Sequence, residues 1–154
     1  MILIFVALGL QGCGSPEKPN IPTVSQIATA SVKSGFPGVS NDFKKFNPAN
    51  EQDKTILKDI VSWLNESKIA KMEGSNRFVP TIGPTTLVLN LANGKQILIE
   101  PAIDSVTKHE GSKTIETGSY AKGFIDFQYG DSTKVFRLKS EPLDNWLLKS
   151  PWKD

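Results

Sequence analysis

Few side chains in this sequence could support catalysis, and their surroundings argue against most of them. His109 is the only histidine in the 154 residues, so a metal site built from several histidines cannot form. A Ser–His–acid triad would have to use His109, which lies between Lys108 and Glu110 in a polar segment typical of an exposed turn. We therefore predict no catalytic residue, no metal ligand and no cofactor.

Two short motifs match catalytic patterns only in part. The letters SYAK at 119–122 match the S-x-x-K of penicillin-recognising serine enzymes, but the S-D-N and K-T-G elements of those enzymes do not occur. The same four-letter pattern recurs at 15–18, which shows how little it specifies. The GSKT at 111–114 lacks the glycine spacing of a phosphate-binding loop. Neither motif predicts an active site.

Carboxylates offer the one remaining route to catalysis. Four of them fall close together in the sequence: Glu100, Asp104, Glu110 and Glu116. Two carboxylates about 5–9 Å apart in a cleft would suit glycoside hydrolysis, and carboxylate oxygens also bind divalent cations. Exposed strand edges are the simpler interpretation. A small hydrolase or metal-dependent enzyme stays as the alternative.

The composition is that of an ordinary globular domain. Hydrophobic residues make up 38% and charged residues 22% of the chain, which predicts one folded domain. The formal net charge is only +2, and the lysines are scattered without interleaved aromatics, so no nucleic-acid partner is expected. We expect a monomer.

The N-terminus predicts export. Residues 1–10 are apolar and too short for a membrane-spanning helix, which needs about 20 residues, but they fit the apolar core of a secretory signal. The letters LQGC at 10–13 resemble the lipobox of bacterial lipoproteins, in which the cysteine receives diacylglycerol. We predict an export signal over 1–12, a lipid attached to Cys13 and a location on the extracytoplasmic face of the cell membrane. Because no basic residue follows Met1, we expect the natural start upstream.

The segments after Cys13 divide into a tether and a domain. Residues 13–22 are polar and rich in proline, and we expect an unpacked tether there. Residues 23–154 form the single domain. It begins with a strand over 24–32 and an edge strand around 43–46. A helix follows Pro48, capped by Asn50, because apolar residues recur there at helical spacing: Ile56, Leu57, Ile60, Val61 and Leu64.

Alternating apolar residues predict two hairpins with defined registers. A three-residue loop with Gly94 in the left-handed position sets Leu89 against Ile97. By the same argument, a four-residue loop over 130–133 sets Phe127 against Phe136. The other pairs on the apolar faces are Leu87 with Ile99 and Ile125 with Leu138.

We expect one or two further strands over 105–108 and 114–120, around a turn at 109–112. A short helix over 140–148 closes the chain. The fold class is therefore α+β, an antiparallel sheet of about four to six strands with one main helix across a face and a short C-terminal helix. This order of elements is similar to that of cystatin-like sheets, which implies nothing about function.

One candidate binding surface follows from the second hairpin. Phe124 lies opposite the apolar row of its own strand, so we expect it on the outer face of the sheet near Val135. Tyr120 joins them in this interpretation. An exposed aromatic patch would mark a binding surface, unless another element covers it.

Several segments together resemble the small lipoproteins of bacilli: the lipobox at 10–13, the Trp-containing segment 56–69, the hairpin over 86–99 and the closing RLKS at 137–140 with Leu143 and Trp146. The resemblance implies a location and a domain type. We therefore expect a non-enzymatic, membrane-tethered binding module whose partner is a protein or the cell wall. Besides the enzyme, a second alternative to the binding module is an inhibitor of an extracellular enzyme, which would act through the loop at 36–38.

Overall fold

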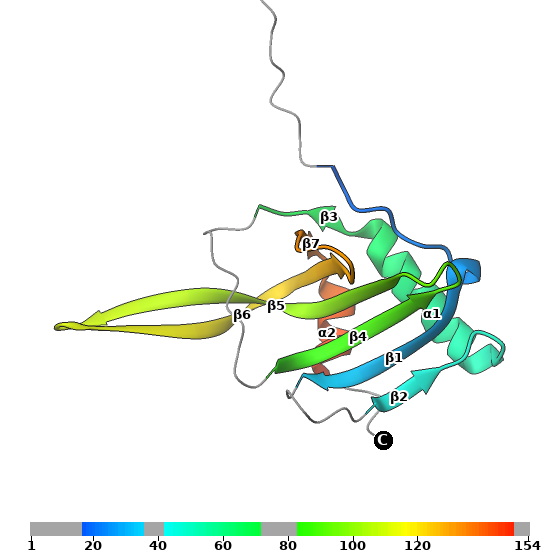
Figure 1. The fold of residues 1–154 in the computed structure, drawn as a ribbon, viewed down its shortest axis with the longest axis horizontal. Coiled ribbons are helices and arrows are strands. Elements are labelled where there is room, and N and C mark those ends of the chain that lie inside the picture. The colour runs from blue at the N-terminus through cyan, green and yellow to red at the C-terminus, as the bar shows by residue number, and fades with distance from the viewer. Residues whose placement is uncertain (1–16, 36–41, 72–82, 150–154) are drawn as a thin grey trace, which may run out of the picture.

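The computed structural model describes residues 17–35, 42–71 and 83–149 (Figure 1). They form an antiparallel seven-stranded sheet with two helices on one face, in the strand order β2-β1-β4-β5-β6-β7-β3. The elements are β1 (Ile27–Gly35), β2 (Asp42–Phe46), α1 (Glu51–Glu66), β3 (Lys68–Ile69), β4 (Gly83–Leu91), β5 (Gln96–Glu110), β6 (Lys113–Tyr129), β7 (Val135–Lys139) and α2 (Glu141–Lys149). The predicted α+β class and both helices are confirmed, whereas the sheet has more strands than the four to six expected.

The start of the domain differs from the expected strand over 24–32. A 3-10 turn occupies Val24–Gln26, and β1 begins only at Ile27. The Thr23 backbone N–H donates to Oε1 of Gln26 at 2.8 Å, and the Gln26 N–H donates back to the Thr23 carbonyl at 3.0 Å. Such local bonds compete with strand pairing, which accounts for the later start of the strand.

Helix α1 begins and packs as predicted. Oδ1 of Asn50 accepts hydrogen bonds from the N–H groups of Gln52 and Asp53, at 2.9 and 3.1 Å. The buried residues of the helix belong to the predicted stripe: Leu57, Ile60, Val61 and Leu64. After the helix, β3 pairs with β7 at the edge of the sheet. Strand β3 could not be predicted, because two residues carry no periodicity.

The registers of both predicted hairpins are confirmed. Leu89 pairs with Ile97 across β4 and β5, and Phe127 pairs with Phe136 across β6 and β7. Gly94 has a φ of 80°, as the three-residue loop requires. These apolar rows pack into the core, which residues of β1, β2 and the two helices complete.

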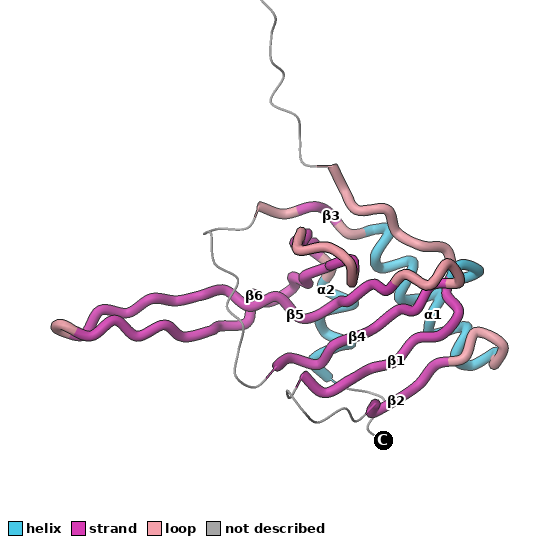
Figure 2. The backbone as a smooth tube through the Cα atoms, in the orientation of Figure 1, coloured by secondary structure: helices cyan, strands magenta, loops and turns pink. Residues whose placement is uncertain are grey.

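Strands β5 and β6 continue far beyond the sheet as a two-stranded hairpin, which both views show projecting from the body (Figures 1 and 2). The segments 105–108 and 114–120, expected as separate short strands, are the outer parts of these two strands. Glu110 pairs with Lys113 across the turn, where Gly111 has a φ of 62°. We call residues 103–120 the arm and the rest of the described chain the body.

The N-terminal segment is packed where an unpacked tether was expected. Pro19 and Pro22 are buried. The Lys18 ammonium donates to the carbonyls of Asn65 and Ser67 at 2.8 and 2.7 Å. The expectation of a tether over 13–22 is therefore wrong from residue 18 onward, because proline rings and a lysine find partners on the body that composition does not reveal. Residues 13–16 lie outside the described part of the chain.

Candidate functional site

The arm is the part of the described chain with the least burial. Its described side chains are mostly exposed on both faces, including Ile115 at 39% and Tyr120 at 55% relative exposure. A two-stranded ribbon without a covered face is marginally stable by itself. The direction in which it projects therefore depends on how it is held where it leaves the sheet.

A large bulge marks that point. Pro101 pairs with Ile125, and the next pair along β5 is Ile103 with Tyr120. Between these pairs β5 contributes only Ala102, whereas β6 contributes residues 121–124. Gly123 within this insertion has a φ of 83°, a conformation that glycine adopts without a steric penalty. A bulge of this kind bends a strand and removes backbone groups from the ladder.

The first turn of α2 satisfies the freed backbone groups of Gly123. The Gly123 N–H donates to Oδ2 of Asp144 at 2.7 Å. The Gly123 carbonyl accepts a hydrogen bond from the Ser140 N–H at 2.9 Å. Asp144 is only 2% exposed. Burial raises the pKa of its carboxyl group, and the hydrogen bond from Gly123 partly opposes that effect. The bulge is thus fixed from the helix-bearing side of the sheet.

Arg137 of β7 fixes the same region from the other face. Its Nε and Nη2 donate to the two carboxylate oxygens of Asp126 at 2.9 and 3.2 Å, in a bidentate pair. Nη1 bonds Asp104, and Nη2 also donates to the Ile103 carbonyl at 3.3 Å. Burial disfavours the guanidinium charge, but Asp126 and Asp104 outweigh it and raise the pKa of Arg137. One charged side chain therefore connects β7, β6 and the first residues of the arm.

Together these contacts define what we call the stem: Gly123, Asp104, Asp126, Arg137 and Asp144 with the backbone groups of Ile103 and Ser140. All the side chains that fix the arm, except the two aspartates of β5 and β6, come from residues 137–144. The stem positions the arm and holds no exposed reactive group besides Asp104, whose side chain is 46% exposed.

The three residues of the predicted binding surface do not meet in one patch. Tyr120 lies on the arm where the bulge begins. Phe124 and Val135 are half-buried, opposite Lys139 and Gln128. The ion pair of Asp126 and Arg137 lies between these two positions. Of the three, Tyr120 is the one that the structure leaves prominently exposed.

The four carboxylates of the enzyme alternative are spread along the hairpin. Glu100 accepts a hydrogen bond from Thr86 at 2.8 Å, and Asp104 is bound by Arg137. Glu110 lies at the arm tip, about 33 Å along the strand from Glu100 at 3.3 Å per residue. Glu116 lies opposite Thr107 in register. Within the described ranges, no group of three His, Cys, Asp or Glu side chains is placed to hold a metal ion.

The remaining predicted residues are placed as follows. His109 is exposed near the arm tip, with Nδ1 3.3 Å from the Thr114 hydroxyl. Ser119 is exposed on the arm opposite Asp104. Cys13 and the loop at 36–38 lie outside the described residues.

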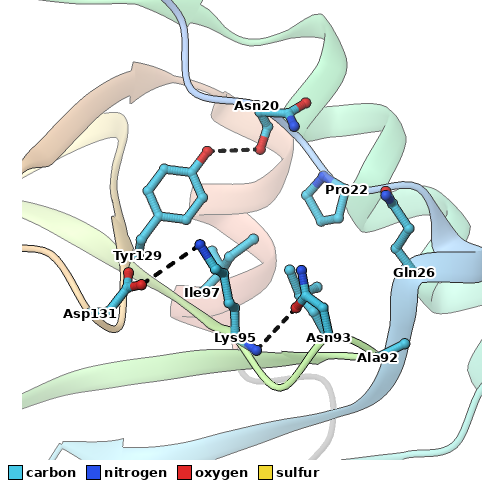
Figure 3. A pocket seen from close by; sticks show the side chains of 10 residues that line it. Asn20, Pro22, Gln26, Ala92, Asn93, Lys95, Ile97, Tyr129 and Asp131 are labelled. Carbon is cyan, nitrogen blue, oxygen red and sulfur yellow. Dashed lines mark hydrogen bonds and ion pairs between the residues drawn. The ribbon is translucent and has the colours of Figure 1, made fainter.

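A hollow of about 450 Å³ lies at the opposite end of the sheet, between the N-terminal segment and the β4–β5 turn (Figure 3). Its polar groups bond one another. The Tyr129 hydroxyl donates to the Asn20 carbonyl at 3.0 Å, and the Lys95 ammonium lies 3.8 Å from the Asp131 carboxylate (Figure 3). These contacts hold the N-terminal segment over the end of the core, which is a structural role.

Comparisons with known protein families, with curated proteins and with solved structures give no match for this chain. In the part of the chain that the structure describes, neither helix is long and apolar enough to span a membrane.

Proposed function

We propose that the protein is a membrane-tethered, extracytoplasmic lipoprotein that binds a partner protein through its arm and has no catalytic activity of its own. The observation that carries this proposal is the arm itself, a hairpin exposed on both faces and fixed at its base. A partner would meet a ribbon whose direction is already set, which lowers the ordering cost of association.

The outer edges of the arm favour a protein partner over a cell-wall polymer. In the described residues, β4 pairs with β5 only as far along β5 as Ile99. Strand β7 begins to pair with β6 only at Phe124, which lies opposite Lys139. Neither outer edge of the arm is therefore paired with a described strand. Strand edges of this kind present backbone N–H and C=O groups that an extended segment of another protein can pair with. The enzyme alternative has less support, because its carboxylates lie far apart or are bound to other residues.

Crosslinking tests the arm directly. A photoreactive phenylalanine analogue replaces Tyr120 or Thr117 on the arm, and Lys58 on the outer side of α1 as the matched exposed control. Irradiated cells should give one discrete adduct from both arm positions and none from Lys58. Equal adducts from all three positions, or none from the arm, would contradict the proposal.

Shortening the arm gives an independent test. Residues 105–118 are replaced by a two-residue turn, which leaves the core and the stem, including Asp104, in place. The shortened protein should unfold at nearly the same denaturant concentration as the wild type and should lose the adduct formed from the parental arm. A shortened protein that still recovers the same partner would show that the body binds it.

The membrane address is tested at Cys13. Cys13→Ser should abolish labelling by a fatty-acid analogue and release the protein from the membrane fraction. Serine retains the size of the side chain but cannot form the thioether to diacylglycerol. A variant that stays in the membrane fraction would contradict the lipid anchor at Cys13 and would leave the proposed role of the arm unaffected.

A further inference from the structure

The docked N-terminal segment fixes where the chain leaves the body. The Lys18 ammonium binds the last carbonyls of α1, those of Asn65 and Ser67, where a positive charge suits the negative end of the helix dipole. Burial lowers the pKa of Lys18. Pro19 and Pro22 are buried behind it. The path of the chain is therefore set from residue 18 onward.

The reach from this point to the proposed lipid is short. Cys13 and Lys18 are five positions apart, and an extended chain covers at most about 3.6 Å per residue. The Cα atom of Lys18 then lies no more than about 18 Å from that of the anchored cysteine. Even at this limit, the separation is only about two Debye lengths at physiological salt, where this length is about 8 Å.

The end of the body around Lys18 carries an excess of lysines. We call it the Lys18 face, and its exposed or half-exposed lysines are Lys18, Lys68, Lys71, Lys134 and Lys139. Among the residues that the structure describes, its carboxylates are fewer: Glu17, Glu66 and Glu141. Glu66 also accepts a hydrogen bond from the Ser62 hydroxyl at 2.8 Å.

Two of these lysines are placed against each other. Lys68 of β3 lies directly opposite Lys139 of β7, an arrangement of like charges that destabilises a strand pair in solution. Lys134 lines a hollow together with Lys18 and Asn65, and its ammonium lies 4.5 Å from the Phe136 ring centre. A negatively charged surface would offset the repulsion between Lys68 and Lys139.

We propose that the Lys18 face lies against an anionic lipid surface, brought there by the short link to Cys13. The inference rests on the lipid anchor of the proposed function and adds the orientation of the body. In Figure 1 the described N-terminus lies beside β3, and the arm leaves the body on another side. The arm is then free of the bilayer and accessible to a partner.

The test uses lipidated protein purified from membranes and reconstituted into vesicles. Cys13 is the only cysteine and is blocked by the lipid. A new cysteine is therefore the single site that a thiol-reactive fluorophore can label. We introduce it either as Lys71→Cys on the Lys18 face or as Ser112→Cys at the arm tip. Vesicles contain phosphatidylcholine with or without phosphatidylglycerol, and headgroup spin labels quench nearby fluorophores. We expect strong quenching at position 71 in anionic vesicles, weak quenching in neutral vesicles, and none at position 112.

Charge reversal provides the matched comparison. K68E with K134E should reduce quenching at position 71 to its level in neutral vesicles, since each lysine beside an anionic leaflet changes the docked population about fivefold. K44E with K113E makes the same change in net charge on β2 and the arm, and should leave quenching unchanged. Equal loss in both double variants would overturn the inference, because net charge alone would then explain it.

The two proposals fail in different ways. Protein that floats with the vesicles but shows no quenching at position 71 would overturn the orientation and leave the anchor intact. Wild-type protein that does not float with vesicles would overturn the anchor and the orientation together. Circular dichroism spectra that match the wild type confirm that each variant is folded.

Discussion

The inner and outer halves of β5 and β6 have opposite chemical patterns, although they belong to the same two strands. In the body, Ile99 lies opposite Phe127 and both are fully buried. In the arm, Ile115 lies opposite Lys108 and is exposed. The inner half is held by burial of one apolar face, whereas the outer half has the ladder between its two strands and the contacts of the stem. The comparison shows that strand pairing can continue where the core ends, provided that the exit is fixed.

The largest effect should come from removing core volume in the inner half. Phe127→Ala should destabilise the protein by about 3 to 5 kcal/mol, because it removes a fully buried ring and leaves a cavity. Ile115→Ala in the arm should change the free energy of unfolding by no more than about 0.5 kcal/mol. Urea denaturation measures both. Similar losses at the two sites would mean that the arm has a core of its own.

The second effect concerns the ion pair of the stem. Arg137→Met should destabilise the protein by about 3 kcal/mol, because it leaves the buried carboxylate of Asp126 without its cation. Replacing both partners, as Asp126→Leu with Arg137→Met, should restore most of that loss. Asp104→Asn should cost much less, since its side chain is 46% exposed. A double variant as unstable as Arg137→Met would show that the arginine acts through other contacts.

The third effect tests the bulge. Gly123→Ala should cost about 1 to 2 kcal/mol, the penalty for an L-residue in the left-handed region. A new Cβ would also lie 3.0 Å from Cγ of Glu141. Gly123→Ala in a Glu141→Ala background removes that contact and retains the backbone penalty. Relative to the wild type, amide hydrogen exchange in the variant should accelerate more in residues 103–120 than in β4. Unchanged exchange in the arm would refute a role of the bulge in fixing it.

The smallest effect is a pH dependence at Asp144. Burial raises the pKa of this carboxyl group above its ordinary value of 3.8, so the folded protein binds this proton more tightly than the unfolded chain does. The contribution of Asp144 to stability is therefore largest below pH 3.8 and declines as the pH rises through the folded pKa. Asp144→Asn should gain stability relative to the wild type over that window in thermal unfolding. A difference between Asp144→Asn and the wild type that stays constant over this pH range would contradict this account.

Much of the body was predictable because burial leaves a pattern in the sequence, although β3 and the packing of residues 18–22 were missed. Alternation set the register of both hairpins, and the spacing of Leu57, Ile60 and Leu64 gave α1. The arm has no such pattern, since both of its faces are exposed, and its length emerged only from the structure.

The stem was partly within reach of the sequence. The predicted register of Phe127 and Phe136 already placed Asp126 opposite Arg137, so the ion pair could have been inferred from it. A glycine inside a strand, such as Gly123, is a known sign of a bulge. The contact of Asp144 with Gly123 joins residues 21 positions apart and depends on how α2 packs, which no local pattern encodes. The same holds for Lys18, whose partners lie at the far end of α1.

Most of the contacts that set the direction of the arm come from one continuous stretch, residues 137–144. The arm and the stem are therefore separable parts of the molecule. Between Asp104 and Tyr120 the described side chains lie outside the core, and the contacts of the stem set the direction of the hairpin. A different hairpin grafted onto the same stem would project in the same direction. The fold can in this sense be used as a holder for interchangeable hairpins, in which recognition is altered and the scaffold is left as it is.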